Sequence, residues 1–378
     1  MTTRPPRFTE PLFVSRPILP PLEEYVGDLE EIWRSQYLTN MGPFHSRLEA
    51  ALQERVGLGH VSLWNNGTNA LTAAVASLDL TGEVVVTPFT FPATVHAVAA
   101  MGLTPVFADI TEDDMTLSAD AVAEALTSST TAVMATHIYG AFCDTQAFAA
   151  LSRETGVRVI YDGAHSFGRH TPVFPDGAAS LGDVTMLSFH ATKLFHTVEG
   201  GALVTTDPAL HERLLGIRNF GIRSEDVVEG IGLNGKMSEL HAAMGLRVLQ
   251  RLDAEIDRRA ALAEIYRRRL AGLDGLEIVA GTGESRQYLV LRIDPKTFGS
   301  SRDQLHETLR SLNIISRRYF YPLCSDIAPY SAHPSARDLP NARRAADECL
   351  ALPFYGGLSA ETVELICDAI AWQHEQGE

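Results

Sequence analysis

The chain has 378 residues, of which 45% are hydrophobic and 21% are charged. This composition is typical of a soluble globular protein and excludes a disordered, collagen-like or coiled-coil chain, and the length favours two domains or one large α/β domain with a smaller appendage. The formal net charge of -16 at pH 7 makes nucleic acid and anionic membranes poor partners, so an anionic ligand needs a local positive site.

Amphipathic helices and short apolar strands alternate over the first two-thirds of the chain. Helices are predicted around Leu22–Trp33 and Leu48–Val56, and further helical patterns follow Gly67, Ser118 and Asp144. Seven apolar or β-branched runs are predicted strands: 61–64, 84–87, 105–110, 132–138, 157–161, 184–188 and 202–205. This alternation predicts a mostly parallel sheet flanked by helices, with ligands bound at the carboxyl ends of the strands.

The remaining third predicts a linking helix and a small α+β domain. Residues 237–270 contain no proline and predict one continuous helix, whose Arg-rich second half is interpreted as a solvated face. Strands at 288–293 and 314–319 and helices at 302–312, 341–350 and 360–373 follow. The expected domains are 1–35 (N-terminal segment and helix), 36–245 (large domain) and 246–378 (linking helix and small domain).

No membrane span, disulfide framework or cysteine metal cluster is expected. The most apolar stretch, 84–108, is interrupted by three prolines, and the four cysteines show no C-x-x-C spacing. Residues 1–21 are rich in Pro and Arg and lack the apolar core of a signal peptide. These features indicate a cytoplasmic, reducing compartment.

The segment Leu187-Ser-Phe-His-Ala-Thr-Lys193, followed by Glu199-Gly-Gly201, is the most informative for chemistry. A predicted strand ends at Ser188, and Lys193 follows five positions later in a loop. Lys193 is either an ordinary surface lysine or a Schiff-base amine held in a site, with the Ser188 hydroxyl binding a phosphate.

Asp162 and His165 follow another predicted strand, in the sequence Tyr161-Asp-Gly-Ala-His-Ser-Phe-Gly168. A carboxylate at this edge needs a partner, because burying it unpaired is costly, and a protonated pyridine nitrogen would serve. The alternative is that Asp162 caps a turn and His165 is a hydrogen-bonded core histidine.

Two further segments could bind a flat, phosphorylated ligand. Gly67 and Thr68 lie where a strand turns into a helix, so backbone N–H groups and the helix dipole can bind an anion there, although a capped helix without a ligand has the same pattern. Phe91 follows the next strand, where its ring could stack on a planar ligand or belong to the core. The GxGxxG match at 230–235 follows a charged segment and no buried strand, which argues against a nicotinamide-binding fold.

Together and in this order, the four segments resemble the DegT/DnrJ/EryC1/StrS family of sugar aminotransferases. The resemblance runs from about Leu38 to Tyr355 and depends on the joint pattern SFHATK…EGG, with DGAHSFG before it and GLNGKMSELHAAMG after it. It implies pyridoxal 5'-phosphate as cofactor, pyridoxamine 5'-phosphate in the half-reaction, and the α/β fold type I of aspartate aminotransferase. That fold has a large domain with a mostly parallel sheet and a small C-terminal α+β domain.

The resemblance also implies roles for eight residues. Lys193 binds the cofactor covalently and moves the proton, Asp162 pairs with the pyridinium nitrogen, and His165 lies near the phenolic oxygen. The other implied cofactor contacts are ring stacking by Phe91 and phosphate binding by Gly67, Thr68, Ser188 and the partner subunit's copy of Asn234, in Gly232-Leu-Asn-Gly-Lys-Met237. The matched asparagine acts across a subunit interface, so a homodimer with shared active sites is implied.

The implied reaction transfers an amino group from L-glutamate, which becomes 2-oxoglutarate, to a nucleotide-linked keto-sugar. Segments 188–201 and 318–322 most resemble the branch that aminates dTDP-4-dehydro-6-deoxy-D-glucose at C4, in deoxysugar biosynthesis for antibiotics or O-antigens. The alternatives are amination of a dTDP-3-dehydro-6-deoxyhexose at C3 and a non-catalytic regulatory protein on the same fold. Lys193 argues against the related dehydratases, which have histidine at that position.

Overall fold

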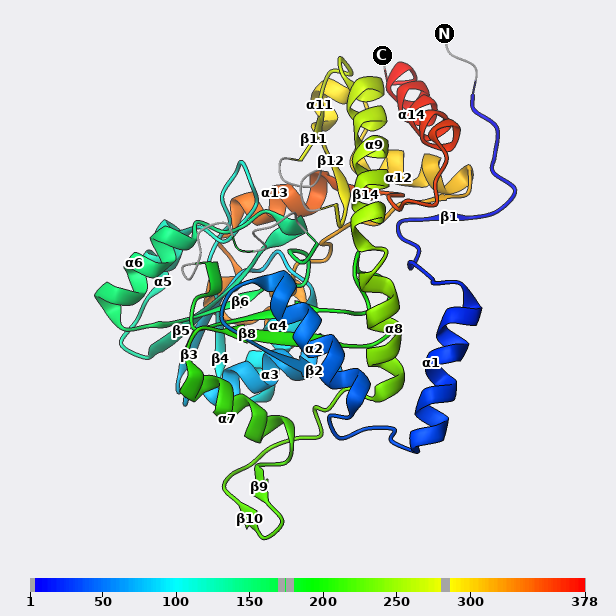
Figure 1. Ribbon diagram of the computed structural model, residues 1–378. Coiled ribbons are helices and arrows are strands. Elements are labelled where there is room, and N and C mark those ends of the chain that lie inside the picture. The colour runs from blue at the N-terminus through cyan, green and yellow to red at the C-terminus, as the bar shows by residue number, and fades with distance from the viewer. Residues whose placement is uncertain (1–3, 169–173, 175–179, 280–285, 378) are drawn as a thin grey trace.

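A seven-stranded sheet forms the centre of the larger part of the molecule in the computed structural model, which describes residues 4–168, 174, 180–279 and 286–377 (Figure 1). Its strand order is β2-β8-β7-β6-β5-β3-β4. The strands are β2 (His60–Trp64), β3 (Glu83–Val86), β4 (Thr104–Phe107), β5 (Thr130–Thr136), β6 (Arg158–Asp162), β7 (Val184–Ser188) and β8 (Gly201–Thr205). Strand β8 is antiparallel to both of its neighbours, and the other six strands run in one direction. The mostly parallel sheet predicted from the sequence is confirmed.

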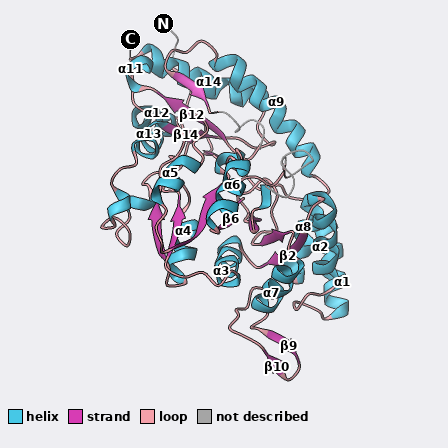
Figure 2. Ribbon diagram, turned by 90° about the vertical axis from the view of Figure 1, so that its left-hand side faces the viewer, coloured by secondary structure: helices cyan, strands magenta, loops and turns pink. Residues whose placement is uncertain are grey.

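Helices cover both faces of this sheet (Figure 2). Helices α3 (Gly67–Ser77), α4 (Pro92–Ala100) and α7 (Pro208–Arg218) pack on the face that includes Val84 and Val86. Helices α2 (Pro43–Val56), α5 (Ala119–Ala125), α6 (Thr145–Thr155) and α8 (Glu239–Leu249) pack on the face that includes Val85 and Leu187. Because both faces are buried, the strands are continuous apolar runs rather than alternating ones.

The smaller C-terminal part is built on an antiparallel sheet of β11 (Leu276–Ile278), β12 (Leu289–Ile293) and β14 (Cys349–Leu352). Its helices are α9 (Leu252–Leu270), α11 (Pro295–Phe298), α12 (Arg302–Ser311), α13 (Pro340–Glu348) and α14 (Ala360–Glu375). Near the N-terminus, β1 (Leu12–Phe13) pairs with β13 (Ile314–Ile315), and α1 (Leu22–Ser35) lies beside α8. The hairpin of β9 (Ile222–Ser224) and β10 (Val227–Val228) projects from the larger part (Figure 1).

Two predicted elements are wrong in extent. The continuous helix over 237–270 is two helices, because the chain tightens at Gln250 and Arg251, where the N–H of Arg251 donates to the carbonyl of Val248. The strand over 314–319 has only two residues, because the chain after Ile315 leaves β1 to line a pocket. The domain boundaries after residues 35 and 245 stay predictions.

The prediction of a solvated arginine face holds for Arg258 and for residues 267–269 of α9, which are exposed, and is wrong for Arg259. Arg259 is 1% exposed, and its Nε donates to Glu255 at 2.7 Å. The Glu255 carboxylate also accepts from the backbone N–H of Gly356. Arg259 is therefore part of the packing between α9 and the chain after β14, where an arginine is tolerated because its charge is paired.

Candidate active site

The carboxyl ends of β6 and β7 bring two of the predicted site residues to one edge of the sheet. Asp162 is the last residue of β6 and Ser188 the last of β7, and the two strands are parallel neighbours. The loop that follows β7 is held by hydrogen bonds from Phe189 N to Gly200 O and from Lys193 N to His190 O. This is the edge at which sheets of this type bind ligands.

Asp162 is buried, and the donors to its carboxylate among the described residues are neutral. It is 3% exposed, and it accepts hydrogen bonds from Thr94 Oγ1 at 2.7 Å and from Ala164 N at 3.0 Å. Burial raises its pKa, against the opposing effects of these two donors and of the Lys193 charge. A cation at this carboxylate would keep it ionised.

Lys193 lies near both Asp162 and His165, since its charge acts on the pKa of each. Burial lowers the pKa of Lys193 to about 8, although the Asp162 carboxylate acts in the opposite direction. A large fraction of this amine is therefore neutral and nucleophilic near pH 8.

We expect covalent labelling of Lys193 by pyridoxal phosphate and borohydride to rise about tenfold from pH 7 to pH 9 and then level off, because a pKa of about 8 leaves little amine to deprotonate above that range. The chain has three lysines, Lys193, Lys236 and Lys296, so mass spectrometry of the labelled peptides separates them. Labelling of Lys193 that keeps rising through pH 10, as for a lysine of ordinary pKa, would contradict the prediction.

His165 is held as a neutral imidazole in a defined orientation. The backbone N–H of Tyr139 donates to its Nδ1 at 3.1 Å, and its ring stacks on Phe320 with an interplanar angle of 8°. Burial and the Lys193 charge hold the pKa of His165 well below its usual value. With Nδ1 acting as the acceptor, the single proton of the neutral ring lies on Nε2, which makes Nε2 the donor atom of the ring.

Gly67 and Ser188 are adjacent at the start of α3. A Cβ on Gly67 would lie 3.3 Å from Ser188 Oγ and 3.1 Å from Met186 Sδ, and a Cβ on Gly201 would lie 3.0 Å from Gly67 N. The Asn66 side chain caps the helix by accepting from Asn69 N. The first N–H groups of α3, including that of the exposed Thr68, have no acceptor within the helix. Together with the Ser188 hydroxyl they form an anion cradle.

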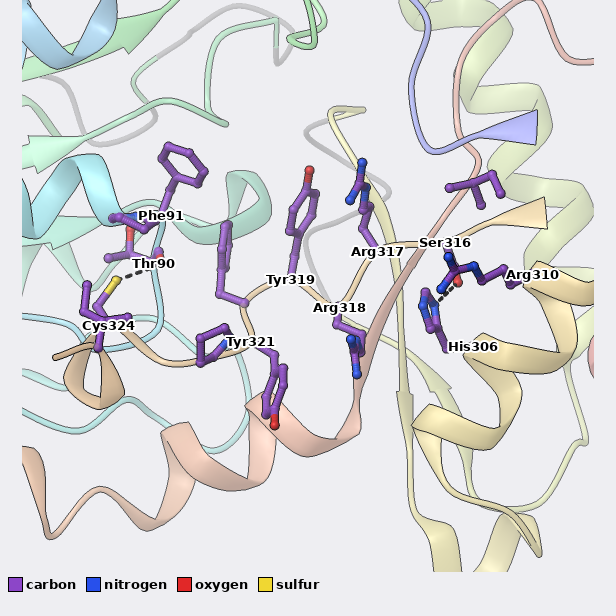
Figure 3. A pocket seen from close by; sticks show the side chains of 15 residues that line it. Thr90, Phe91, His306, Arg310, Ser316, Arg317, Arg318, Tyr319, Tyr321 and Cys324 are labelled. Carbon is purple, nitrogen blue, oxygen red and sulfur yellow. Dashed lines mark hydrogen bonds between the residues drawn. The ribbon is translucent and has the colours of Figure 1, made fainter. Parts of the chain in front are cut away.

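Phe91 is not in the core: it is 59% exposed at the N-cap of α4, and its ring stands clear of its own loop (Figure 3). Its carbonyl accepts from the N–H of Thr94, whose hydroxyl binds Asp162. This exposed aromatic ring therefore lies one helical turn from the buried carboxylate, where a planar ligand could cover it.

Asn234 lies in the loop after the projecting hairpin, and the structure leaves its side chain exposed. Its backbone forms a bridge with Asn219, and its carbonyl accepts from Asn65 Nδ2 at 3.0 Å. The contact of this side chain with the cofactor of a second subunit stays a prediction.

These residues fit pyridoxal phosphate. The close approach of Gly67 and Gly201 leaves room for no side chain at the anion cradle, the buried Asp162 carboxylate can accept a cationic ring nitrogen, and the Lys193 amine is partly neutral. Among the described residues, no group of three or more His, Cys, Asp or Glu side chains is arranged to bind a metal ion.

Residues that sequence reasoning missed complete the surroundings of the site. Thr94 and Tyr139 position Asp162 and His165 through the hydrogen bonds described above. Phe320 reaches His165 from a segment more than 150 residues later in the chain. Two of them had a signal in the sequence: Thr94 lies three residues after Phe91 and hence on the same face of a helix, and Phe320 lies in segment 318–322, which carries part of the resemblance.

A cavity of about 560 Å³ adjoins Phe91 (Figure 3). Segment 315–322 lines it together with residues of α12 and the loop before α4.

In the part of the chain that the structure describes, no helix has the length and apolar character needed to cross a membrane.

Comparisons with known proteins show which proteins this chain is similar to. A protein of Shigella dysenteriae named dTDP-4-amino-4,6-dideoxy-D-glucose transaminase is 41% identical over 366 residues, which cover 96% of this chain and 98% of that protein. The GDP-perosamine synthase of Vibrio cholerae is 32% identical, over 89% of this chain and 92% of its own. The crystal structure of DesI in the presence of its TDP-sugar product superimposes with a TM-score of 0.93 at 35% identity, covering 99% of this chain and 95% of DesI.

Residues 22–371 match the DegT/DnrJ/EryC1/StrS aminotransferase family, which confirms the resemblance seen in the sequence. The α/β fold type I predicted from that resemblance is also confirmed. The chain therefore belongs to the DegT/DnrJ/EryC1/StrS aminotransferase family and is a pyridoxal-phosphate-dependent aminotransferase.

Proposed function

We propose that this enzyme transfers the amino group of L-glutamate to C4 of dTDP-4-dehydro-6-deoxy-D-glucose and forms dTDP-4-amino-4,6-dideoxy-D-glucose. The observation that carries the chemistry is the buried Asp162 carboxylate beside a lysine whose pKa is lowered to about 8. The choice of sugar is supported by the name of the 41% identical Shigella relative and by the likeness to DesI, which was crystallised with a TDP-sugar product.

We propose one role for each site residue, which the family resemblance implies and the position of the side chain supports. When bound, pyridoxal phosphate supplies the electron sink for the carbon that loses its proton. Asp162 would hold the ring nitrogen, His165 Nε2 would donate to the phenolic oxygen, and Phe91 would stack on the ring. Gly67, Thr68 and Ser188 would bind the phosphate at the start of α3. Lys193 accepts the proton from the amino donor and returns it to the acceptor carbon, which its lowered pKa allows near neutral pH.

The test is a single incubation with L-glutamate and dTDP-4-dehydro-6-deoxy-D-glucose, in which NMR locates the new C–N bond and 2-oxoglutarate is measured in parallel. We expect one 2-oxoglutarate for each sugar aminated at C4. Amination only of a dTDP-3-dehydro-6-deoxyhexose would favour the C3 alternative. No product from any nucleotide sugar, GDP-linked ones included, would favour a non-catalytic protein.

We also propose that the enzyme is a homodimer in which Asn234 of each subunit reaches the cofactor phosphate of the other. Apolar side chains on and beside the projecting hairpin support this: Phe220, Ile222, Val227, Val228 and Ile231 are all more than a third exposed, and Ile231 is 98% exposed. The outer surface of α1 adds Leu22, Val26 and Trp33. Exposed apolar area of this kind marks an interaction surface.

Replacing Ile231 with Asp should shift the enzyme from dimer to monomer and remove most of its activity. The carboxylate would have to be buried in the interface without a partner, and the displaced loop carries Asn234. Light scattering after size-exclusion chromatography measures the mass, and Ile231→Val is the matched control because it keeps most of the apolar contact. A fully active monomeric wild type would contradict the proposal.

We further propose a cytoplasmic location. The cysteines Cys143, Cys324, Cys349 and Cys367 are all free and buried. Unpaired buried thiols are typical of proteins that fold in a reducing compartment.

A further inference from the structure

The cavity beside Phe91 is cationic in a strongly acidic protein. Its described lining includes Arg310, Arg317 and Arg318 and no Asp or Glu, whereas the whole chain has a net charge of -16. The same wall carries the aromatic rings of Phe91, Tyr319 and Tyr321. Cations and flat rings in one cavity favour a ligand that joins anionic groups to planar ones.

A stack of rings joins this cavity to the active site. The ring of His165 stacks on Phe320 at 5.9 Å between centroids, and Phe320 stacks on Tyr319 at 5.1 Å. Tyr319 also packs edge-on against Tyr288 at 5.4 Å. If one end of a ligand reaches the active site past Tyr319, the end farther from the active site therefore lies near Arg317.

Arg317 and Tyr319 point to the same side of their segment, the side on which the Phe91 ring stands (Figure 3). Arg318 and Tyr321 point to the opposite side (Figure 3). The backbone of Arg317 is anchored by two hydrogen bonds with Ala351 of β14, and the chain then turns at Tyr319 and Phe320, where the N–H of Tyr321 donates to the carbonyl of Arg318 at 2.9 Å. On the side of segment 315–322 that faces the Phe91 ring, the cavity is thus lined by Phe91, Tyr319 and Arg317.

The two neighbouring arginines differ in their partners. The Arg318 guanidinium lies 3.2 Å from the Asp303 carboxylate and 5.2 Å from the centre of the Tyr321 ring. Among the described residues, the exposed Arg317 guanidinium makes no ion pair or side-chain hydrogen bond. The third arginine of the lining, Arg310, lies 3.9 Å from the Glu307 carboxylate, so Arg317 is the lining arginine whose charge is left for a ligand.

We propose that Arg317 is the residue that binds the diphosphate of the nucleotide sugar, with the sugar lying over Tyr319 toward the cofactor. This inference rests on the proposed function for its ligand. A guanidinium presents paired N–H donors that match phosphate oxygens. A cavity of about 560 Å³ is of the size that takes a nucleotide-sized ligand.

The experiment measures the inhibition constant of dTDP, KM for the nucleotide sugar and KM for L-glutamate in Arg317→Gln, Arg317→Lys and the matched control Arg318→Gln. For Arg317→Gln we expect the inhibition constant of dTDP and KM for the nucleotide sugar to rise about 10- to 100-fold, which is the range for losing a hydrogen bond to a charged group. We expect kcat and KM for L-glutamate to stay within about threefold, because this variant removes no contact at the cofactor. Arg317→Lys should restore part of the affinity, and Arg318→Gln should change each value less than threefold.

Thymidine, which has no phosphate, is the second control, and its weak inhibition should be the same in wild type and Arg317→Gln. The L-glutamate half-reaction, followed by the cofactor spectrum, reports that each variant is folded and loaded. A dTDP inhibition constant unchanged in Arg317→Gln would overturn the proposal, as would a rise confined to KM for L-glutamate, which would make Arg317 a carboxylate-binding residue.

The outcomes separate this inference from the proposed function. If the wild type aminates the dTDP-sugar at C4 and Arg317→Gln binds dTDP normally, the function stands and the role of Arg317 is wrong. If dTDP binding depends on Arg317 but no dTDP-sugar is aminated, the anion site stands and the proposed substrate is wrong.

Discussion

Replacing Lys193 with alanine is expected to lower kcat for amino transfer by roughly three to four orders of magnitude, the upper range for removing a general acid–base group. The spectrum of the covalently bound cofactor should disappear, because no other lysine is placed to form that bond. Lys236 donates to Asn219 and lies against Phe220, and Lys296 is exposed on α11 in the smaller part. Stopped-flow absorbance with L-glutamate measures both effects.

Lys193→Arg and Lys296→Ala are the controls for this experiment. Arginine keeps a cation near Asp162 but stays protonated at any working pH, so it should be as inactive as alanine while preserving the charge in the site. Lys296→Ala removes an exposed amine and should leave kcat unchanged. Normal turnover by either Lys193 variant would show that another group moves the proton.

Replacing Asp162 with asparagine should lower kcat about 10²- to 10³-fold, as expected for removing a preorganised charge from a buried site. The carboxylate is positioned by Thr94 Oγ1 at 2.7 Å and Ala164 N at 3.0 Å, and asparagine can keep contacts to both. The loss would therefore report the missing charge rather than a displaced side chain. Asp162→Ala should bind some cofactor and lose most of the rate.

Asp162→Asn should also raise the free energy of unfolding of the apoenzyme, from which the cofactor has been removed. Burial raises the pKa of Asp162 in the folded state, so this carboxyl is easier to protonate folded than unfolded. Its contribution to stability is then largest at acid pH and declines as pH rises through the folded pKa. Above that pKa, Asp162→Asn removes a destabilising buried charge, and the melting temperature of the apoenzyme should rise.

Thermal melts with and without pyridoxal phosphate at pH 5 and pH 8 test this sign. The melting temperature of the Asp162→Asn apoenzyme should exceed that of the wild-type apoenzyme by more at pH 8 than at pH 5. Added cofactor should raise the melting temperature of this variant less than that of the wild type. Thr94→Val is the matched control, because it removes a hydrogen bond from Asp162 and keeps the charge. Equal kcat in wild type and Asp162→Asn would contradict the electron-sink role of the site.

The sequence predicted the sheet well because its strands are buried on both faces. Runs such as Val84-Val85-Val86 and Val184 to Ser188 are apolar in a way that only central strands of such a sheet require. Helix boundaries were less predictable. The break at Gln250–Arg251 depends on contacts of Arg251 with Arg247 O and with Glu24, which is over 200 residues away in the chain.

By itself, the sequence determined the order of strands and helices along the chain, and with it that Asp162 and Ser188 end strands and that Gly67 begins a helix. These features are local, because a strand end and a helix start depend on residues a few positions away. The tertiary structure alone decided that burial lowers the pKa of Lys193 to about 8, that the strands ending at Asp162 and Ser188 are neighbours, and that Tyr139 orients His165. It also decided that Arg317 and Phe91 share one cavity, because burial and contact at these positions come from segments that only folding brings together.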